Sequence, residues 1–424
     1  MNWAGNVTFA AAELVRPSSV EQLQDLMSDR RRVRALGSGH SFNPIADTDG
    51  TLVSLENMPG EVEVDPAGRR AWVPAGATYG RICPELHAEG WALANLASVP
   101  HVTVAGACAT GTHGSGRSNP GLAAAVSALE LVRPGGELET VTSADADFAG
   151  SVVALGAVGI ALRMQLELEP AYDVVQEVFL DVPLDAVLDD LEVVLGVGDS
   201  VSLFTNWATP ETFGQVWVKR RVPVGEPTAS TRSLRDLVGG RPAPAAVHPV
   251  PGADPAAATD QLGVPGAWHE RLPHFRADAV PSAGAELQSE WLVPAGLGAD
   301  AVGRIAAIAP ALAPLVLVSE VRAVAADEPW LSPAWQRDSV ALHFTWRPDP
   351  DAVADLLPMV EETLSPFDPR PHWGKLAATG PDALRQAYPR LRDFRELADR
   401  VDPERVLSNP FVDRCLGRRD SLDR

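Results

Sequence analysis

The chain is poor in cysteine and has no long apolar run. Its three cysteines, Cys83, Cys108 and Cys415, are too few for a disulfide framework, and no two of them have the spacing of metal ligands. The longest apolar stretch, residues 152–161, is shorter than the roughly 18 residues that a membrane-spanning helix needs. We therefore expect no membrane partner and no metal site.

Basic residues are also scarce. The chain has 35 Lys and Arg against 56 Asp and Glu, a formal net charge of −21, and binding to phosphates needs a basic face. A nucleic-acid partner is therefore excluded. Residues 1–5 lack the basic and apolar regions of a secretory signal, so we expect a cytoplasmic protein. Without a large exposed apolar stripe, we expect a monomer.

The remaining composition indicates a globular enzyme. The chain has 424 residues, 46% of them hydrophobic, with 35 Gly and 37 Pro, which predicts two or three domains with many turns. Short strands and a few helices with mostly antiparallel signals favour an α+β fold. The expected strands are 32–36, 51–55, 62–64, 70–73, 128–132, 138–141, 162–168, 201–204, 215–219, 286–293, 315–324 and 340–346. The expected helices are 18–27, opened by a capping box of Ser18 and Glu21, then 79–89, 300–308, 351–363 and 381–399, and residues 223–265 form a loop.

Two glycine-rich loops lie in the first part of the chain. Residues 37–42, GSGHSF, follow a strand but lack the third glycine of the dinucleotide fingerprint, so alone they are more typical of a turn. Residues 105–116, AGACATGTHGSG, add a second set of small and hydroxyl side chains. Such residues let backbone N–H groups approach a pyrophosphate closely, and together the two loops favour an anion cradle. No Walker lysine follows either loop, so we do not expect a nucleotide triphosphatase.

The sequence does not support a serine hydrolase or a zinc site. The sequence has no Gly-x-Ser-x-Gly elbow between a strand and a helix. His269 and His274 are five residues apart with Pro273 between them, and residues five apart do not share a helix face.

Polar pairs interrupt two apolar strands near the C-terminus. Glu320 and Arg322 are two apart, as are His343 and Thr345, so each pair points to one face of its strand. Each pair taken alone is compatible with a structural ion pair or a buried histidine. Because charges inside an apolar strand are costly unless paired or used, the two pairs with the following HWGK segment, 372–375, favour a polar catalytic pocket.

Several motifs resemble those of FAD-dependent oxidoreductases of the vanillyl-alcohol oxidase type, and among them alditol oxidases. The resemblance runs nearly end to end. It rests on LGSGHSFN (36–43), ASVPH (97–101), ATGTHGSG (109–116), SEVR (319–322), HFTW (343–346) and PHWGK (371–375). The stretch WHERLPHFR (268–276) is the one specific to the alditol branch.

This resemblance implies a PCMH-type FAD-binding domain and a cap built on an antiparallel sheet. The implied division is 1–170 for the FAD domain, 171–380 for the cap and 381–424 for a segment returning to the FAD domain. His40 would carry FAD covalently. The other implied cofactor contacts are Gly37, Ser38, Gly39, Ser41, Ser98, Thr103, Gly106, Thr110, Gly111, Thr112, His113, Ile160 and His372, and the implied polyol contacts are Ser98, Glu320, Arg322, Thr345 and Lys375.

The implied reaction oxidises the terminal primary alcohol of an alditol such as xylitol or sorbitol to the aldose. Hydride would pass to flavin N5 and electrons then to O2, giving H2O2. Arg322 and Lys375 are expected to stabilise the developing alkoxide, and Glu320 to hold Arg322 and accept from a substrate hydroxyl. Either a neutral His343 or Lys375 with a lowered pKa is expected to take the proton.

Cys108 falls where bicovalent relatives attach FAD through a second bond, but we expect a small buried apolar residue there. Two alternatives stay open. A sugar-lactone oxidase or dehydrogenase of the gulonolactone type shares the motifs, and a silent sugar-binding protein would share the scaffold without needing His40.

Overall fold

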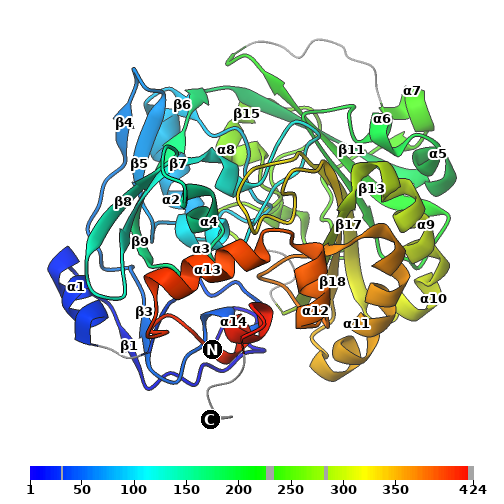
Figure 1. Ribbon diagram of the computed structural model, residues 1–424. Helices are drawn as coiled ribbons and strands as arrows, with labels where there is room; N and C mark the ends of the chain where they lie inside the picture. The colour runs from blue at the N-terminus through cyan, green and yellow to red at the C-terminus, as the bar shows by residue number, and fades with distance from the viewer. Residues whose placement is uncertain (30–31, 226–233, 281–284, 419–424) are drawn as a thin grey trace.

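The computed structural model describes residues 1–29, 32–225, 234–280 and 285–418. Figure 1 shows two halves side by side, an N-terminal half in blue to teal and a cap in green to orange. The C-terminal helices, in red, run back over the N-terminal half. The predicted loop 223–265 is described only outside residues 226–233 and contains little regular structure there.

Within the described residues, the N-terminal half contains three sheets, mostly antiparallel as expected. The exception is a three-stranded parallel sheet in the order β1-β3-β2. A five-stranded antiparallel sheet has the order β4-β5-β9-β7-β8, and β10 pairs with β6. The strands are β1 (Glu13–Val15), β2 (Val33–Ala35), β3 (Thr51–Val53), β4 (Glu63–Asp65), β5 (Arg70–Pro74), β6 (Trp91–Ala92), β7 (Val126–Val132), β8 (Leu138–Thr142), β9 (Ile160–Glu167) and β10 (Glu169–Pro170).

Among the residues that the structure describes, the α-helices of this half are α1 (Val20–Asp29), α2 (Tyr79–Ala88), α3 (Val104–Ala109) and α4 (Phe148–Val152). The predicted first helix is confirmed, but its cap is one residue later than expected. Ser19 Oγ accepts from the backbone N–H of Gln22 at 3.3 Å, while Ser18 bonds the Gln22 side chain. The second glycine-rich segment, expected as a loop, holds α3, because alanines 105, 107 and 109 are strong helix formers.

One large antiparallel sheet forms the cap. Its order is β14-β11-β13-β12-β17-β18-β16-β19, with β15 on β11. The strands are β11 (Asp173–Pro183), β12 (Ser200–Thr205), β13 (Thr212–Val222), β14 (Arg241–Pro242), β15 (Gly266–Ala267), β16 (Leu287–Pro294), β17 (Val316–Val324), β18 (Ser339–Trp346) and β19 (Arg370–Pro371). The sequence analysis missed β11, whose buried positions do not alternate in the period of two that marks a half-buried strand.

Helices cover one face of the cap sheet. They are α5 (Leu184–Asp189), α6 (Leu191–Val194), α7 (Leu234–Val238), α9 (Gly298–Ala307), α10 (Ala309–Leu312) and α11 (Pro350–Leu364). The short helix α8 (Trp268–Arg271) lies elsewhere, with Trp268 in the core of the N-terminal half. Apolar residues of β16, β17 and β18, such as Trp291, Val321 and Leu342, form one core with α9 and α11. Because side chains alternate along a strand, the residues between these point to the opposite face, toward the N-terminal half.

The last helices complete the N-terminal half. The charged segment expected as one helix forms two, α12 (Pro381–Ala387) and α13 (Leu391–Val401), followed by α14 (Pro410–Cys415). Pro389 separates α12 from α13, because the residue before a proline is driven out of the helical region. Leu391, Phe394 and Val412 pack in the same core as Val152 and Met164, so the C-terminus contributes to the N-terminal half.

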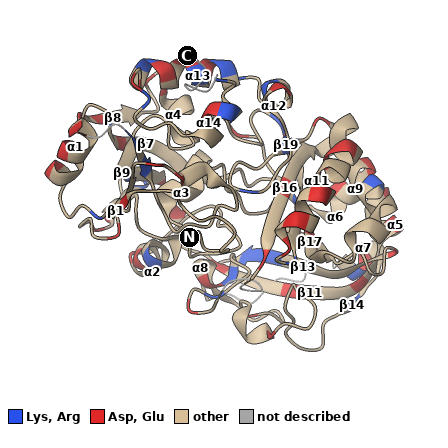
Figure 2. Cartoon of the chain, turned by 90° about the horizontal axis from the view of Figure 1, so that it is seen from below, with Lys and Arg blue, Asp and Glu red and all other residues tan. Residues whose placement is uncertain are grey.

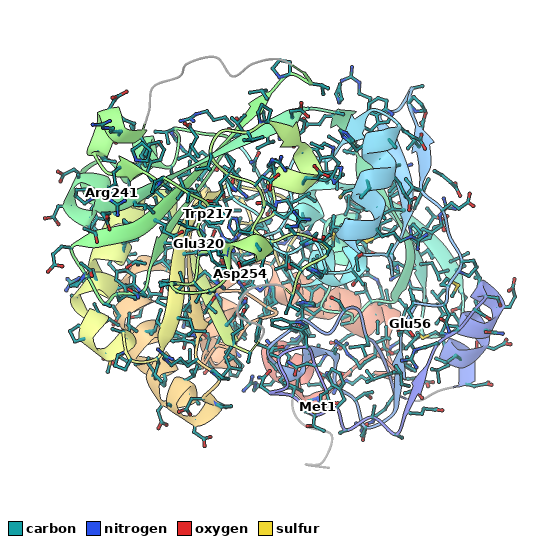
Figure 3. The ribbon with its side chains drawn as sticks, turned by 180° about the vertical axis from the view of Figure 1, so that it is seen from behind. Met1, Glu56, Trp217, Arg241, Asp254 and Glu320 are labelled. Atoms are coloured by element: carbon teal, nitrogen blue, oxygen red, sulfur yellow. The ribbon has the colours of Figure 1, made fainter. Side chains whose placement is uncertain are left out.

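Charge is distributed over the outer helices. Acidic residues, red in Figure 2, lie on α1, α9 and α11. In Figure 3, Trp217 and Glu320 are labelled in the cap and Glu56 in the other half. None of the helices in the described ranges is both long and apolar enough to cross a bilayer.

Candidate active site

A cavity of about 450 Å³ lies between the two halves. One wall is made by the glycine loops and neighbouring strands of the N-terminal half, and the other by β16, β17 and β18 of the cap. We call them the loop wall and the sheet wall. The predicted site residues that line the cavity are Gly37, Ser38, Gly39, His40, Ser41, Ser98, Thr103, Gly106, Thr110, Thr112, His113, Ile160, Glu320, Arg322, His343, Thr345, His372 and Lys375.

Gly111 is placed differently from the prediction. It does not line the cavity and has φ +68°, and a Cβ there would lie 2.8 Å from Pro333 Cδ. Its role is to let the chain turn beside Pro333. Glycine is required because this backbone conformation is unfavourable for other residues.

The loop wall has room for a ligand because the residues at its surface are small. Gly39 has φ +71°. A Cβ on Gly37 would lie 2.4 Å from Thr103 Oγ1, and one on Gly106 2.7 Å from the same atom. The two loops therefore approach each other closely at Thr103, as a backbone cradle for a pyrophosphate requires.

His40 is buried in the loop wall with its ring stacked on Trp3, the centroids 4.9 Å apart. Neither ring nitrogen has a hydrogen-bond partner within the described part of the chain. Burial, helped by His101, lowers the pKa of His40 to about 4, so the imidazole is neutral at physiological pH. Buried polar atoms without partners are rare in native proteins, and a covalent bond to a cofactor would account for one of them. The loop wall therefore fits FAD.

Cys108 points away from the cavity, as the predicted small buried residue. It is fully buried on α3, and its Sγ lies 3.7 Å from the Tyr79 hydroxyl oxygen. Burial raises the pKa of the Cys108 thiol to about 12. The thiol is neither ionised nor directed at the cavity.

The sheet wall places three polar side chains abreast. Glu290 of β16 pairs with His343 of β18, which pairs with Glu320 of β17. The predicted partners Arg322 and Thr345 follow two residues along their strands and face the same cavity. The strand pairing thus brings together polar groups from positions far apart in the sequence.

Glu290 is the centre of this wall and was missed by the sequence analysis. Its Oε1 accepts from Arg322 Nη2 at 2.8 Å and its Oε2 from Lys375 Nζ at 2.6 Å. Burial would raise the pKa of the Glu290 carboxyl, but Lys375 and Arg322 outweigh burial and hold the pKa well below its ordinary value. Glu290 lies inside a predicted apolar strand, the same signal that pointed to Glu320.

Lys375, His343 and Thr345 form a chain of hydrogen bonds. Lys375 Nζ lies 2.8 Å from His343 Nδ1, and His343 Nε2 lies 3.0 Å from Thr345 Oγ1. Burial and the nearby Lys375 charge hold the pKa of His343 well below its ordinary value, so His343 is neutral. Burial also lowers the pKa of Lys375, although Glu290 opposes the shift. The chain can transfer a proton.

Glu320 forms the expected ion pair with Arg322 and has a closer partner that was not expected. Its Oε1 lies 2.9 Å from His274 Nε2, while Arg322 Nη1 stands 3.5 Å from its Oε2. Arg322 also donates to Glu290, and its Nη1 donates to Ser98 Oγ at 3.1 Å. Burial would raise the pKa of Glu320, but Arg322 and His274 outweigh it and keep the carboxyl ionised. His274 was discounted because only its spacing from His269 was weighed.

The two histidines of the rejected zinc motif lie apart in function. His269 contacts the His87 ring, with centroids 5.1 Å apart, whereas His274 lines the cavity. Among the residues that the structure describes, no three His, Cys, Asp or Glu side chains gather as a metal site would require.

Two family models match the chain. An FAD-binding-domain model matches residues 11–142, and a D-arabinono-1,4-lactone oxidase model matches residues 285–415. An alditol oxidase of a Streptomyces species is 47% identical over 425 residues, covering 100% of this chain and 98% of that protein. The chain belongs to the alditol oxidase family. It is an FAD-dependent oxidoreductase with the PCMH-type α+β fold that the motifs predicted.

More distant relatives of this alditol oxidase family member span the chain as well. L-gulono-1,4-lactone dehydrogenase of Mycobacterium tuberculosis is 26% identical over 430 residues, covering 98% of both proteins. L-gulonolactone oxidase of Mus musculus is 25% identical, covering 98% of this chain and 97% of that protein. The crystal structure of cholesterol oxidase from B. sterolicum has a TM-score of 0.75 at 16% identity, covering 98% and 96% of the two chains. That likeness confirms the fold.

Proposed function

We propose that this enzyme oxidises the terminal primary alcohol of alditols, such as xylitol and sorbitol, to the aldose, with O2 as the electron acceptor and H2O2 as the second product. The observation that carries the proposal is the composition of the cavity. A loop wall suited to FAD faces a sheet wall that presents two carboxylates, Glu290 and Glu320, with two cations and the neutral imidazole of His343. The 47% identity to an alditol oxidase supports the choice of substrate.

FAD would be held by the loop wall. The proposed covalent attachment is at His40, whose ring nitrogens are buried without partners. The other proposed contacts are Gly37, Ser38, Gly39, Ser41, Ser98, Thr103, Gly106, Thr110, Thr112, His113, Ile160 and His372. When bound, FAD supplies the acceptor for two electrons, which the protein residues cannot supply themselves.

The polyol would be held by Ser98, Glu320, Arg322, Thr345 and Lys375, all of which line the cavity. Glu320 is ionised and can only accept a hydrogen bond, so it selects for a substrate hydroxyl as donor. Arg322 and Lys375 carry N–H groups that stabilise negative charge developing on the reacting oxygen. Their charges are held in place by the shared partner Glu290.

The hydroxyl proton would leave to the Lys375–His343 pair. The two nitrogens are 2.8 Å apart, and each has its pKa lowered mainly by burial. Because His343 is neutral, one of its ring nitrogens carries no proton, as a general base requires. His343 Nε2 extends the path to Thr345 Oγ1.

For organisation, we propose that residues 1–170 with 381–424 form the FAD-binding domain and residues 171–380 the cap. The shared core of the C-terminal helices with the N-terminal half supports this division. The low cysteine content and acidic composition support a monomer that works in the cytoplasm.

The first test is the visible spectrum of purified protein, followed by acid precipitation. A yellow pellet is expected, since covalent flavin stays with the denatured chain, and H40A should release its flavin into the supernatant. Oxidase assays on xylitol, sorbitol and L-gulono-1,4-lactone then separate the two substrate classes. H2O2 formation with the lactone alone would favour a lactone oxidase, in line with the D-arabinono-1,4-lactone oxidase model that matches residues 285–415. Colourless folded protein supplied with FAD would contradict both.

A further inference from the structure

Lys219 is a second buried lysine that the proposed reaction leaves without a role. Of the 35 Lys and Arg in the chain, only Lys219 and Lys375 are lysines, and all the rest are arginines. Lys375 lies in the active site. Lys219, on β13, is 1% exposed, and no carboxylate of the described residues lies within 4.0 Å of its ammonium group. A buried ammonium without an ion pair is costly, so its partners indicate what it does.

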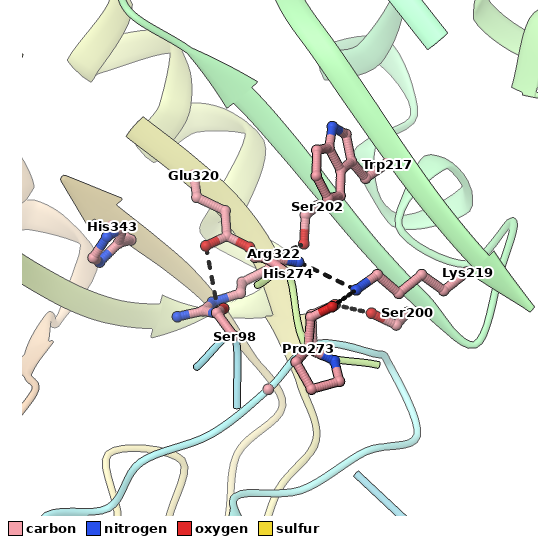
Figure 4. A network of polar contacts seen from close by, with 12 residues as sticks. Ser98, Ser200, Ser202, Trp217, Lys219, Pro273, His274, Glu320, Arg322 and His343 are labelled. Carbon is pink, nitrogen blue, oxygen red and sulfur yellow. Dashed lines mark hydrogen bonds and ion pairs between the residues drawn. The ribbon is translucent and has the colours of Figure 1, made fainter. Parts of the chain in front are cut away.

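The three N–H groups of Lys219 all have acceptors on one segment. Nζ donates to the carbonyl oxygens of Leu272 at 2.5 Å and Pro273 at 3.0 Å, and lies 3.2 Å from His274 Nδ1. Burial lowers the pKa of Lys219 to about 7, although the Glu320 charge opposes the shift. In its protonated form Lys219 has no lone pair, so Nδ1 must accept, and the single proton of a neutral imidazole is then on Nε2. Figure 4 shows Lys219 pointing from β13 at His274, with Glu320 on the far side of the ring.

His274 is kept neutral as well as oriented. Burial, together with the adjacent Lys219 charge, lowers the pKa of His274 to about 4. Phe204 and Trp217 pack edge-on against the ring at centroid distances of 5.5 and 5.4 Å. The ring is therefore fixed, uncharged, and able to give one hydrogen bond, through Nε2, to Glu320 Oε1 at 2.9 Å.

This arrangement determines what Glu320 offers the cavity. Oε1 accepts from a neutral donor, so the carboxylate keeps its full negative charge. Oε2 accepts no hydrogen bond from the described residues and stands 3.5 Å from Arg322 Nη1. The same segment also holds Ser98, whose carbonyl accepts from the backbone N–H groups of His274 and Phe275 at 2.9 and 3.2 Å. One segment thus positions two of the proposed polyol contacts.

We propose that Lys219 is a positioning residue for substrate recognition: by donating to His274 Nδ1 it keeps His274 neutral with its proton on Nε2, and so presents Glu320 as an ionised, acceptor-only site for a hydroxyl of the polyol chain. This inference deepens the proposed function and rests on it. It assigns the Trp268–Arg276 stretch a function in binding the hydroxyl groups of the polyol chain.

A double-mutant cycle separates this role from packing. K219M keeps the length of the side chain and removes the donors, whereas H274Q replaces the imidazole by an amide that always carries N–H groups and does not ionise. The steady-state KM and kcat for xylitol are measured in the wild type, both single variants and the double variant, each normalised to bound flavin. We expect K219M to raise KM about tenfold in the His274 background, the loss typical of a hydrogen bond to a charged group.

In the H274Q background, the same K219M change should alter KM by less than about threefold, since no tautomer or charge remains to be set. The value of kcat should fall less than KM rises in K219M, since Lys219 does not touch the reacting hydroxyl. Equal effects of K219M in both backgrounds would show that Lys219 acts only through packing and would overturn the proposal.

A second measurement does not use K219M. In the flavin-loaded wild type labelled with 15N-histidine, we expect His274 to show a protonated Nε2 and a bare Nδ1 at about pH 6, below the pKa of Lys219, its signals assigned by their absence in H274Q. A proton on Nδ1, alone or with Nε2, would overturn the inference. If flavin-loaded wild type oxidises no polyol, the proposed function fails together with the role of Glu320, whereas a correct tautomer would still support the Lys219–His274 contact.

Discussion

The two walls of the cavity bind by different physical means. The loop wall consists of glycine, serine and threonine with an unpartnered histidine, and its space comes from missing side chains at Gly37 and Gly106. The sheet wall carries buried charges, Glu290, Glu320 and Arg322 among them, each held by another ionisable group. Close backbone approach suffices to hold a large cofactor, whereas chemistry on a small alcohol needs charges that only partners can keep buried.

The difference between the two walls predicts which substitutions should impair the enzyme most. On the loop wall, loss of one side chain removes one contact among many. On the sheet wall, loss of one charge leaves its partners buried and unpaired, which costs more than the lost contact itself. The predictions below test this contrast, beginning with the largest expected effect.

Glu290→Gln should be the most damaging substitution. It leaves Arg322 and Lys375 without their shared carboxylate, and removing one partner of a buried pair costs about 3–5 kcal/mol. The free energy of unfolding, from urea denaturation of the flavin-loaded enzyme, measures the effect. Glu167→Gln is the matched control, because its pair with Arg70 is exposed and should contribute at most about 1 kcal/mol. Equal stabilities for the two variants would contradict the central role of Glu290.

Lys375→Ala and Arg322→Ala should each lower kcat on xylitol by about 10²–10³-fold, the loss typical of one preorganised donor to a developing oxyanion. Single-turnover reduction of the bound flavin, followed by its absorbance, isolates the chemical step from product release. Normal reduction rates in both variants would show that the reacting hydroxyl does not lie at the sheet wall.

The pH dependence of polyol binding should report on His274. With a pKa of about 4, His274 becomes charged only below that pH, where it would neutralise Glu320 and raise KM for xylitol. K219M removes a positive neighbour, so the pKa of His274 rises toward its ordinary value of about 6.5 and the rise in KM moves to higher pH. Glu320 and Arg322, the other charged neighbours, stay unchanged. A profile that K219M does not move would argue against the coupling.

Cys108→Ser should have the smallest effect. The thiol faces Tyr79 rather than the cavity and is not ionised, so flavin content after acid precipitation and kcat should match the wild type. The intact mass of the denatured variant should still include FAD. Loss of the covalent flavin would place Cys108 in the linkage and weaken the contrast between the walls.

Local signals predicted the elements well where one face is buried. The helices at 79–89, 300–308 and 351–363 and the strands near 315–324 and 340–346 were found within a few residues. The elements that the sequence analysis missed or misplaced each have a physical cause. Strand β11 lacks alternation, α3 lies in a glycine-rich segment whose alanines favour helix, and Pro389 divides the expected C-terminal helix.

The candidate site shows the same limit. Glu320 with Arg322 and His343 with Thr345 were found as pairs because two-residue spacing within a strand is a local property. Their further partners were missed, since Arg322 pairs more closely with Glu290, at 2.8 Å, than with Glu320, at 3.5 Å. Hydrogen bonds between strands far apart in sequence have no local pattern.

The sequence by itself determined the family, the cofactor class and most of the cavity lining, because glycine loops and charges within apolar strands are local patterns with few physical uses. Only the tertiary structure decided how the charges are shared. Strand register placed Glu290, His343 and Glu320 abreast, and the segment around Pro273 brought Lys219 and His274 to Glu320. Such pairing depends on distances between distant segments, which packing of the whole chain establishes.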